Sequence, residues 1–234
     1  MMNKNKITIE VRSAAGGEEA KIWADDLLRM YLRFAEKQGW QTNLVGPGVL
    51  QIQGQNSYDL LKYEAGVHRV QRIPKTEKYG RIHTSTATVV VLPETPETEI
   101  VINPNDLEWQ FYRASTQGGQ NVQKVSSAVR VIHKPSGLVV TCEQERTQEQ
   151  NRKIALNLLR LKLWQKEQEK KQTEITILRR EAVGHGMRSE KIRTFNYPQN
   201  RVTDHRLKKS FHNLESILDG NLGKIINSLV KTIR

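Results

Sequence analysis

The sequence predicts an α+β protein made of two units, and three kinds of pattern support this prediction. Short apolar stretches, such as the alternating Lys6–Arg12 and the β-branched Thr86–Leu92, are typical of strands. Two long amphipathic stretches, Glu18–Lys37 and Thr147–Glu181, predict helices. Between these groups, Pro93–Asn105 holds three prolines and predicts a linker.

Further elements are expected on either side of that linker. Two short amphipathic helices are expected within Asn213–Ile233, separated by Gly220. Apolar or alternating runs bounded by turn residues predict the remaining strands. These strands are Trp40–Val45, Val49–Gln53, Tyr58–Tyr63, Val67–Ile73, Glu108–Ala114, Ala128–His133 and Leu138–Glu143.

The charge of the chain is strongly positive and unevenly distributed. Lysine and arginine number 37 against 25 acidic residues, which gives a net charge of +12. The stretch Lys170–Lys209 alone holds 11 basic and 4 acidic residues, a net charge of +7. A basic chain with clustered charge favours a polyanionic partner, and nucleic acid is the usual one.

Several classes of site are not expected. The single cysteine, Cys142, allows no intrachain disulfide and lies in an apolar run that predicts burial. The six histidines show no metal-ligand spacing, and no phosphate-binding loop is present, so we expect no metal and no cofactor. No apolar run reaches the roughly 20 residues of a membrane span, and the N-terminus has no apolar leader segment. The expected location is cytoplasmic, with no membrane partner.

The stretch Arg113–Gln123, R-A-S-T-Q-G-G-Q-N-V-Q, is the most unusual in the chain. Gly118 and Gly119 precede Gln120, and predicted strands lie on both sides. Paired glycines permit positive φ and allow the backbone to approach another molecule closely. The residues alone leave two interpretations open, a flexible hairpin turn or a loop tip that contacts a partner.

Five segments together carry a resemblance to a known family. They are G-G-Q-N-V with Ser127–Arg130, H-R-V-Q-R-I-P-K-T (68–76), G-R-I-H-T-S (80–85), S-E-K-I-R-T-F-N-Y-P-Q (189–199) and R-V-T-D-H-R (201–206). Along the chain these segments follow the order of the family, and nearly the whole chain resembles the class I bacterial peptide-chain release factors. The resemblance is closest to the branch known as release factor one, which reads the stop codons UAA and UAG.

The resemblance implies a catalytic role for Gly118, Gly119 and Gln120. In the family this loop enters the ribosomal peptidyl-transferase centre, where the glutamine backbone N–H stabilises the transition state of peptidyl-tRNA ester hydrolysis. The glutamine side chain helps to place water, and a glutamine methyltransferase modifies it to N5-methylglutamine. Positioning and preorganised donors can supply much of the acceleration for an activated ester. Such a protein acts only together with the ribosome and is not a free-standing enzyme.

The resemblance also implies a codon-binding set. Its members are Gly16, Glu19, Gln71, Pro74, Lys75, Thr76, His83 and Thr84. The tripeptide Pro74-Lys75-Thr76 matches the codon-reading tripeptide of the family, and the Thr76 hydroxyl can both donate and accept a hydrogen bond to U and then A. At the tip of the first long helix, Gly16 and Glu19 would contact the first base through their backbone.

The remaining members of this set concern the second and third bases. His83 would stack on the second base, and Gln71 with Thr84 would read the third, since an amide and a hydroxyl can accommodate either purine. Without the resemblance, His83 is better explained as a satisfied loop histidine and Gln71 as a residue of a strand surface, because each is a lone polar residue.

The resemblance implies partners and a division of the chain. The partners are both ribosomal subunits with their RNA, the stop codon of the mRNA and the P-site peptidyl-tRNA, bound by a monomer. Codon recognition is expected in residues 1–100 together with 190–234, and hydrolysis in residues 104–185. Hinges near Pro93–Asn105 and Val183–Ser189 would let the two move.

The chain departs from the family pattern at several places. We expect no counterpart of the N-terminal helical domain of the family in this sequence. Val45–Tyr58 is shorter than in the family, and Thr116 and Gln123 replace the preferred glycine and asparagine. Two other functions are therefore considered, a ribosome-rescue hydrolase that needs no stop codon and an RNA-binding protein without catalysis. The intact codon-reading segments favour termination.

Overall fold

The computed structural model describes residues 3–74, 77–94, 101–113, 125–184 and 187–232. The chain divides into two compact units. Unit 1 comprises Met1–Pro96 and Ile175–Arg234, and unit 2 comprises Glu97–Glu174. Both units combine helices with sheets, which confirms the α+β class.

Unit 1 is built on an eight-stranded mixed sheet. Its strands are β1 (Asn3–Ser13), β2 (Gln41–Gly46), β3 (Val49–Gln53), β4 (Gly66–Arg72), β5 (His83–Glu94), β9 (Lys191–Asn196), β10 (Arg201–Asp204) and β11 (Lys209–His212). Their order is β11-β10-β9-β4-β5-β1-β3-β2. The β4–β9 pair is parallel, and the other neighbours are antiparallel. The C-terminal strands thus continue a sheet that begins with the N-terminal ones.

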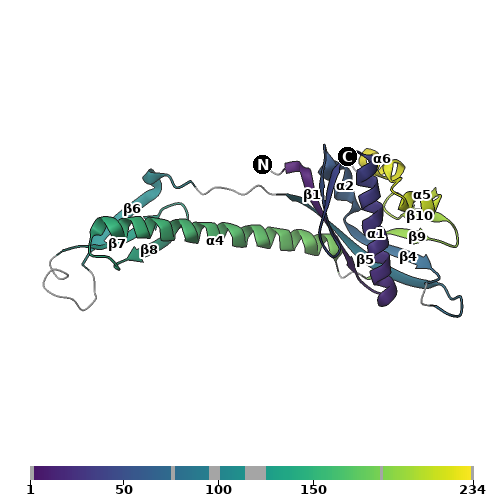
Figure 1. Ribbon diagram of the computed structural model, residues 1–234, viewed down its shortest axis with the longest axis horizontal. Coiled ribbons are helices and arrows are strands. Elements are labelled where there is room, and N and C mark those ends of the chain that lie inside the picture. The colour runs from purple at the N-terminus through teal and green to yellow at the C-terminus, as the bar shows by residue number, and fades with distance from the viewer. Residues whose placement is uncertain (1–2, 75–76, 95–100, 114–124, 185–186, 233–234) are drawn as a thin grey trace. The chain divides into compact units, whose positions relative to one another are not determined.

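Helix α1 (Glu18–Lys37) packs against this sheet and supplies much of the core. The predicted stripe Trp23, Leu27, Met30, Tyr31 and Phe34 is buried throughout, as its 3.6-residue period requires. The α5 and α6 helices lie beside α1 in Figure 1 and contribute Leu214 and Ile226 to the same core. The other helical segments of unit 1 are α2 (Ser57–Leu61), η1 (Lys62–Glu64), η3 (Arg188–Glu190), α5 (Leu214–Leu218) and α6 (Gly223–Thr232).

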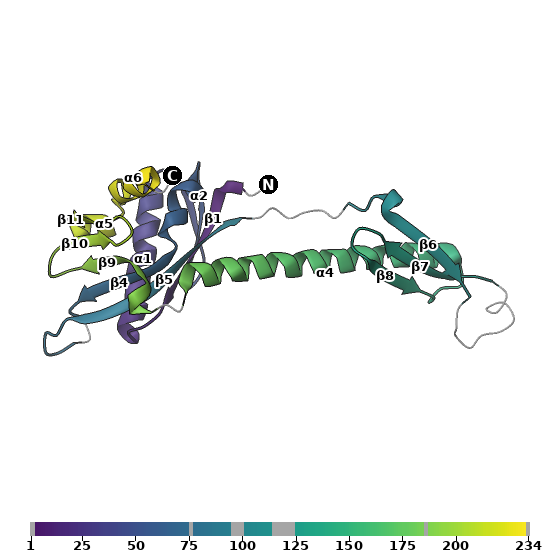
Figure 2. The same ribbon diagram turned by 180° about the vertical axis from the view of Figure 1, so that it is seen from behind.

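Unit 2 is a three-stranded antiparallel sheet that packs on a helix. The strands β6 (Leu107–Tyr112), β7 (Ala128–His133) and β8 (Leu138–Cys142) lie in this order, after η2 (Pro104–Asp106). Helix α4 (Gln148–Val183) begins in unit 2, and Figure 2 shows β6, β7 and β8 beside this part of it. Ala155 and Leu159 of α4 close a small core over the sheet. The backbone N–H of Gln150 donates to the Thr147 hydroxyl at 3.3 Å, so Thr147 caps the start of this helix.

The secondary structure of unit 1 differs from the sequence prediction in two places and agrees with it near the C-terminus. The predicted strand Tyr58–Tyr63 is wrong, because α2 and η1 occupy this stretch. Its buried residues Ser57, Leu61 and Glu64 follow i, i+4, i+7, which is a helical period hidden in the sequence by the charge of Glu64. Strands β9, β10 and β11 were not expected in the basic C-terminal stretch. The two short helices near the C-terminus are confirmed as α5 and α6.

Candidate functional site

Three elements of unit 1 meet at one end of the large sheet. Strand β4 ends at Arg72, β5 begins at His83, and the two pair so that Gln71 lies opposite Thr84 and Arg72 opposite His83. The chain entering α1 joins them, because the Ala14 N–H donates to the Thr86 carbonyl at 2.9 Å. Both Figure 1 and Figure 2 place the lower end of α1 beside the junction of β4 and β5. The implied codon-binding residues that the structure describes gather there.

The close approach of the α1 tip to β5 requires a glycine at position 16. Gly16 has φ of +134°, and a Cβ atom on it would lie 2.4 Å from the Ser85 hydroxyl oxygen. Gly17 follows with φ of +62° and forms the N-cap without a side-chain hydrogen bond. Side chains rarely adopt such φ values, so glycines suit both positions, and the close approach to β5 is made by Gly16. The N–H groups of the first turn point out of the helix and suit an external acceptor.

Glu19 is turned inward and held by an arginine of β4. Its side chain is 6% exposed, and the Arg72 Nε donates to Glu19 Oε1 at 2.5 Å. Within the described parts of the chain, the other carboxylate oxygen, Oε2, is buried without a hydrogen-bond partner. The carboxylate of Glu19 is therefore committed to the interior and does not face the solvent at the helix tip.

The two residues implied for the third codon base lie side by side on β4 and β5. Gln71 is half-buried, and its carbonyl accepts from the Tyr197 N–H at 3.0 Å while its side-chain oxygen accepts from the Asn196 amide at 3.4 Å. Thr84 is half-buried on the opposite strand. Residues at the end of β9 therefore hold Gln71 in place. Thr84 lies opposite Gln71 on β5.

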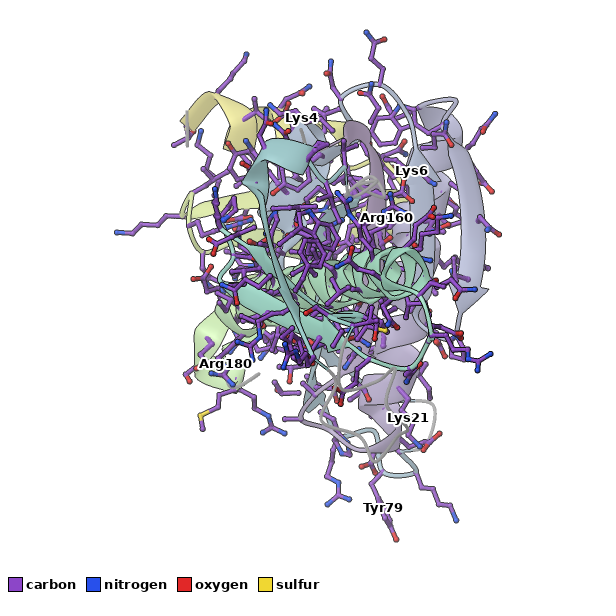
Figure 3. All side chains as sticks on the ribbon, turned by 90° about the vertical axis from the view of Figure 1, so that its left-hand side faces the viewer. Lys4, Lys6, Lys21, Tyr79, Arg160 and Arg180 are labelled. Carbon is purple, nitrogen blue, oxygen red and sulfur yellow. The ribbon has the colours of Figure 1, made fainter. Side chains whose placement is uncertain are left out.

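His83 is held by an acidic residue of the β4–β5 connection. The His83 Nε2 lies 2.7 Å from Glu77 Oε2, and Glu77 also accepts from the Tyr79 N–H at 2.8 Å. This N–H donor and the nearby Arg81 and His83 keep the pKa of Glu77 below its usual value, so it stays an anion. Tyr79 itself is 82% exposed and projects outward in Figure 3. The contact fixes the imidazole edge while its ring remains accessible.

The tripeptide implied for codon reading is described only in part. Pro74 is buried, and its carbonyl accepts from the Glu77 N–H at 3.1 Å, which closes a turn. Lys75 and Thr76 lie outside the described residues.

The Gly118-Gly119-Gln120 loop also lies outside the described residues, but its return to β7 is well defined. The Asn151 side chain is fully buried at the start of α4, and its amide donates to the carbonyls of Ser127 and Glu145, both at 2.9 Å. Its oxygen accepts from the Glu145 N–H at 2.9 Å and from the Cys142 thiol. One amide therefore joins the base of the loop to α4 and to the end of β8.

The basic C-terminal stretch is partly structural. Arg193 is fully buried and donates to both Glu64 oxygens, at 2.6 and 2.8 Å, so it is not available to a phosphate. Phe195 is also buried, with its ring centroid 4.8 Å from that of Trp23, so it anchors this segment to the core. Other basic residues of the stretch are exposed, namely Lys170, Arg180, Arg188, Lys208 and Lys209.

Sequence reasoning missed two residues that organise these sites, Arg72 and Asn151. Arg72 lay within a recognised segment, but its partners in α1 lie some fifty residues away along the chain, and a strand pattern assigns it to a surface. Asn151 lay within a predicted helix, where a polar residue carries no signal of burial. Only the meeting of distant segments reveals either one.

Two negative findings apply to the part of the chain that the structure describes. Three or more metal-ligating side chains do not come together within it. Within the same residues, no helix has the length and apolar character that crossing a membrane requires. Cys142 is buried, as its apolar run predicts.

Comparison with known proteins identifies relatives of the whole chain. The PCRF domain model matches residues 1–89 and the RF-1 domain model matches residues 96–206. "Peptide chain release factor 1" of Thermotoga maritima is 52% identical over 97% of this chain and 69% of its own length. The same-named protein of Thermoanaerobacter pseudethanolicus is 49% identical over 97% of this chain and 67% of its length. Among solved structures, RF2 of Thermus thermophilus matches with a TM-score of 0.57 and 40% identity, over 97% of this chain and 68% of that one.

Proposed function

The chain belongs to the peptide chain release factor family, and from this premise we propose that it terminates translation at UAA and UAG codons in the ribosomal A site. It then triggers hydrolysis of the peptidyl-tRNA ester in the peptidyl-transferase centre. The chain spans about two thirds of the length of its curated relatives.

The observation that carries this proposal is the convergence of residues at the end of β4, the start of β5 and the tip of α1. Gln71 pairs with Thr84, Glu77 holds His83, and Gly16 lies against Ser85. Amide, hydroxyl, imidazole and helix N–H groups of this kind can recognise and stack on unpaired bases. We assign codon reading to residues 1–100 with 190–234, which contain these elements.

We assign hydrolysis to residues 104–185, which contain the Gly118-Gly119-Gln120 loop. The Gln120 backbone N–H would donate to the oxyanion of the transition state, and its side chain would place the attacking water. A side chain at position 118 or 119 would keep the backbone from close contact with RNA and substrate. We further propose that Gln120 carries an N5-methyl group, added by a glutamine methyltransferase.

The reaction depends on partners that supply most of the site. Ribosomal RNA of both subunits, the mRNA codon and the P-site peptidyl-tRNA would surround the bound factor. The exposed basic residues of the C-terminal stretch, including Lys208 and Lys209, support contact with RNA phosphates. The factor by itself would have no hydrolytic activity on free peptidyl-tRNA.

The testing experiment measures release of formyl-methionine from ribosomes that hold initiator tRNA in the P site. The A site would contain UAA, UAG, UGA, a sense codon or no codon. Release on UAA and UAG alone is the expected result. Release with a sense codon or an empty A site would instead indicate ribosome rescue, and binding without release would indicate an RNA-binding protein.

Two variants separate the roles within the loop. Gln120→Pro removes the backbone N–H, and we expect release at saturating factor to fall by about 10²–10³-fold, the usual effect of losing an oxyanion donor. Gln120→Ala keeps the N–H and should retain more activity. Gln117→Ala is the control, and an equal loss in this variant would contradict the assignment to Gln120.

A further inference from the structure

We propose that Arg72 is a positioning residue that sets discrimination of the first codon base, by fixing the tip of α1 against the end of β4. This inference rests on the proposed function, in which Gly16 and Glu19 meet the first base through their backbone. Arg72 itself would touch no base.

Arg72 is the last residue of β4 and binds groups from two other segments. Its Nε donates to Glu19 Oε1 at 2.5 Å, and its Nη1 donates to Asp26 Oδ2 at 2.7 Å and to the Tyr197 hydroxyl at 3.1 Å. The Arg72 side chain is 14% exposed, so water screens these contacts only weakly. One guanidinium therefore joins β4, the first turns of α1 and the segment after β9.

The position requires an arginine rather than any cation. A planar guanidinium can donate to two carboxylates in fixed directions, whereas an ammonium group is a single point of charge. The Arg72 guanidinium also lies 5.8 Å from the Trp23 ring and 5.3 Å from the Tyr197 ring. Stacking of this kind holds the plane in place and is weaker for lysine.

Arg72 gives the tip of α1 a second attachment, because the hydrogen bonds of Ala14 and Ala15 to Thr86 fix only the chain that enters the helix. Gly17 is the N-cap and makes no side-chain capping bond, and both Gly16 and Gly17 have positive φ. Glu19, Trp23 and Asp26 lie at i, i+4 and i+7, which places them on one face of the first three turns. Arg72 contacts all three, so it fixes both the rotation and the position of the helix start.

The same contacts decide what the helix tip presents. Because Arg72 holds the Glu19 carboxylate inside, the negative charge is kept away from an RNA base. The N–H groups of the first turn then remain the groups that a base acceptor can meet. A small rotation of the tip would move these donors relative to the first base. Gln71 belongs to β4 and His83 to β5, so the groups that meet the other two bases would stay in place.

The chain offers a matched control at the same carboxylate. Arg29 Nη2 donates to the other oxygen of Asp26 at 3.0 Å, but its side chain is 59% exposed. Arg29 has the same charge and shares a partner with Arg72, yet it contacts neither β4 nor Glu19 in the described contacts. Its replacement should therefore change charge without releasing the helix tip.

The experiment compares Arg72→Lys, Tyr197→Phe and Arg29→Gln in the formyl-methionine release assay, on UAA, CAA and UAC codons. For Arg72→Lys we expect the factor concentration for half-maximal release on UAA to rise about tenfold, equivalent to about 1.4 kcal/mol. The maximal rate should stay within about twofold, because the hydrolytic loop belongs to the other unit. Discrimination of UAA over CAA should fall about tenfold, while that of UAA over UAC is unchanged.

The two companion variants sharpen this expectation. Tyr197→Phe keeps the ring and removes one hydrogen bond, so it should fold normally and shift first-base discrimination in the same direction by about threefold. Arg29→Gln should leave all three codons unaffected. Equal loss of discrimination at the first and third bases would overturn the proposal, as would a lower melting temperature with first-base discrimination intact.

Hydrogen exchange of the free protein tests the structural step without ribosomes. Arg72→Lys should speed exchange of the Ile22–Asp26 amides, which donate to carbonyls one turn earlier, at least about tenfold and leave Met30–Phe34 unchanged. If the unmodified chain shows no codon dependence, the proposed function is wrong, and this measurement still decides whether Arg72 fixes the helix tip. Unchanged exchange at Ile22–Asp26 would overturn the inference in either case.

Discussion

Unit 1 stabilises its sheet with a buried network of charges, whereas unit 2 joins its elements through one buried neutral amide. In unit 1, Arg193 binds Glu64 at 2.6 Å and Asp204 at 3.2 Å, and none of the three side chains is exposed. The Tyr31 hydroxyl donates to Glu64 at 3.0 Å, and Arg206 adds a second cation to Asp204 at 2.7 Å. Arg193 belongs to β9, Asp204 to β10 and Tyr31 to α1, so the network joins these three elements.

In unit 2 the corresponding linking role falls to Asn151. Its four hydrogen bonds connect the loop base, the end of β8 and the start of α4. The apolar core around it is small, with Leu159 as its largest fully buried side chain. A small core cannot offset the desolvation of several charges, whereas a larger one can. The comparison suggests that unit 1 depends on charge pairing and unit 2 on neutral hydrogen bonds.

The largest expected effect tests the charge network. Arg193→Met leaves Glu64 buried without its main cation, and we expect it to destabilise unit 1 by about 3–5 kcal/mol. Hydrogen exchange, read separately for each unit, would measure the loss, and unit 2 should be unaffected. Arg188→Met, an exposed change in the same segment, is the control and should cost less than about 0.5 kcal/mol. A loss below about 1 kcal/mol for Arg193→Met would break the comparison.

The next effect concerns acid. Burial, aided by the positive charge of Arg193, lowers the pKa of His68 from its ordinary value to about 4. The unfolded chain therefore binds a proton near pH 6.5 that the folded chain refuses until about pH 4, so stability is lost as pH falls through this window. We expect unit 1 to lose about 2–3 kcal/mol between pH 7 and pH 4.5, and His68→Gln to flatten this dependence.

Neighbouring titrations allow a check on this assignment. Despite the cost of their burial, Glu64 and Asp204 have pKa values below their usual ones because of Arg193 and Arg206, so their losses begin at lower pH. His205 is only partly buried, and His205→Gln should leave most of the slope in place. An unchanged slope in His68→Gln would mean that another group is responsible.

A smaller effect is expected in unit 2. Asn151→Ala leaves the carbonyls of Ser127 and Glu145 without their donor, and we expect a loss of about 2 kcal/mol confined to this unit. Asn157→Ala is the control, because Asn157 is exposed on the same helix and accepts only from Arg160 at 3.3 Å. Denaturant unfolding followed by hydrogen exchange would measure both. Equal losses in the two variants would show that burial of Asn151 contributes nothing.

The smallest effect sharpens the geometry of the α1 tip. Gly16→Ala combines an unfavourable φ of +134° with overlap of Ser85, whereas Gly80→Ala has φ of +71° and open space around its Cβ. We expect Gly16→Ala to cost about 1 kcal/mol more than Gly80→Ala, because relief of the overlap must move β5 or the helix start. Comparison of the two melting curves measures this difference. Equal costs would mean that the tip has room to adjust.

Much of the candidate site could be predicted from the sequence because its residues lie in short contiguous segments. Gln71, His83 and Thr84 lie in matched stretches, and the structure places them together at the junction of β4 and β5. The position of Gly16 and Glu19 beside this junction depends on packing of α1 across the sheet. Lys75, Thr76 and Gly118–Gln120 remain predictions, since they lie outside the described residues.

The sequence by itself determined the α+β class, the helix α1 with its buried stripe, the helix α4 with its Thr147 cap, and the paired glycines of the central loop. These features follow from local periodicity, capping and backbone freedom, which depend only on residues that are close together in the sequence. Only the tertiary structure decided that α2 is a helix, that β9 pairs with β4, and that Arg72 and Arg193 turn inward. Their partners are distant in the chain, and whether a charge is buried depends on partners that folding alone brings together.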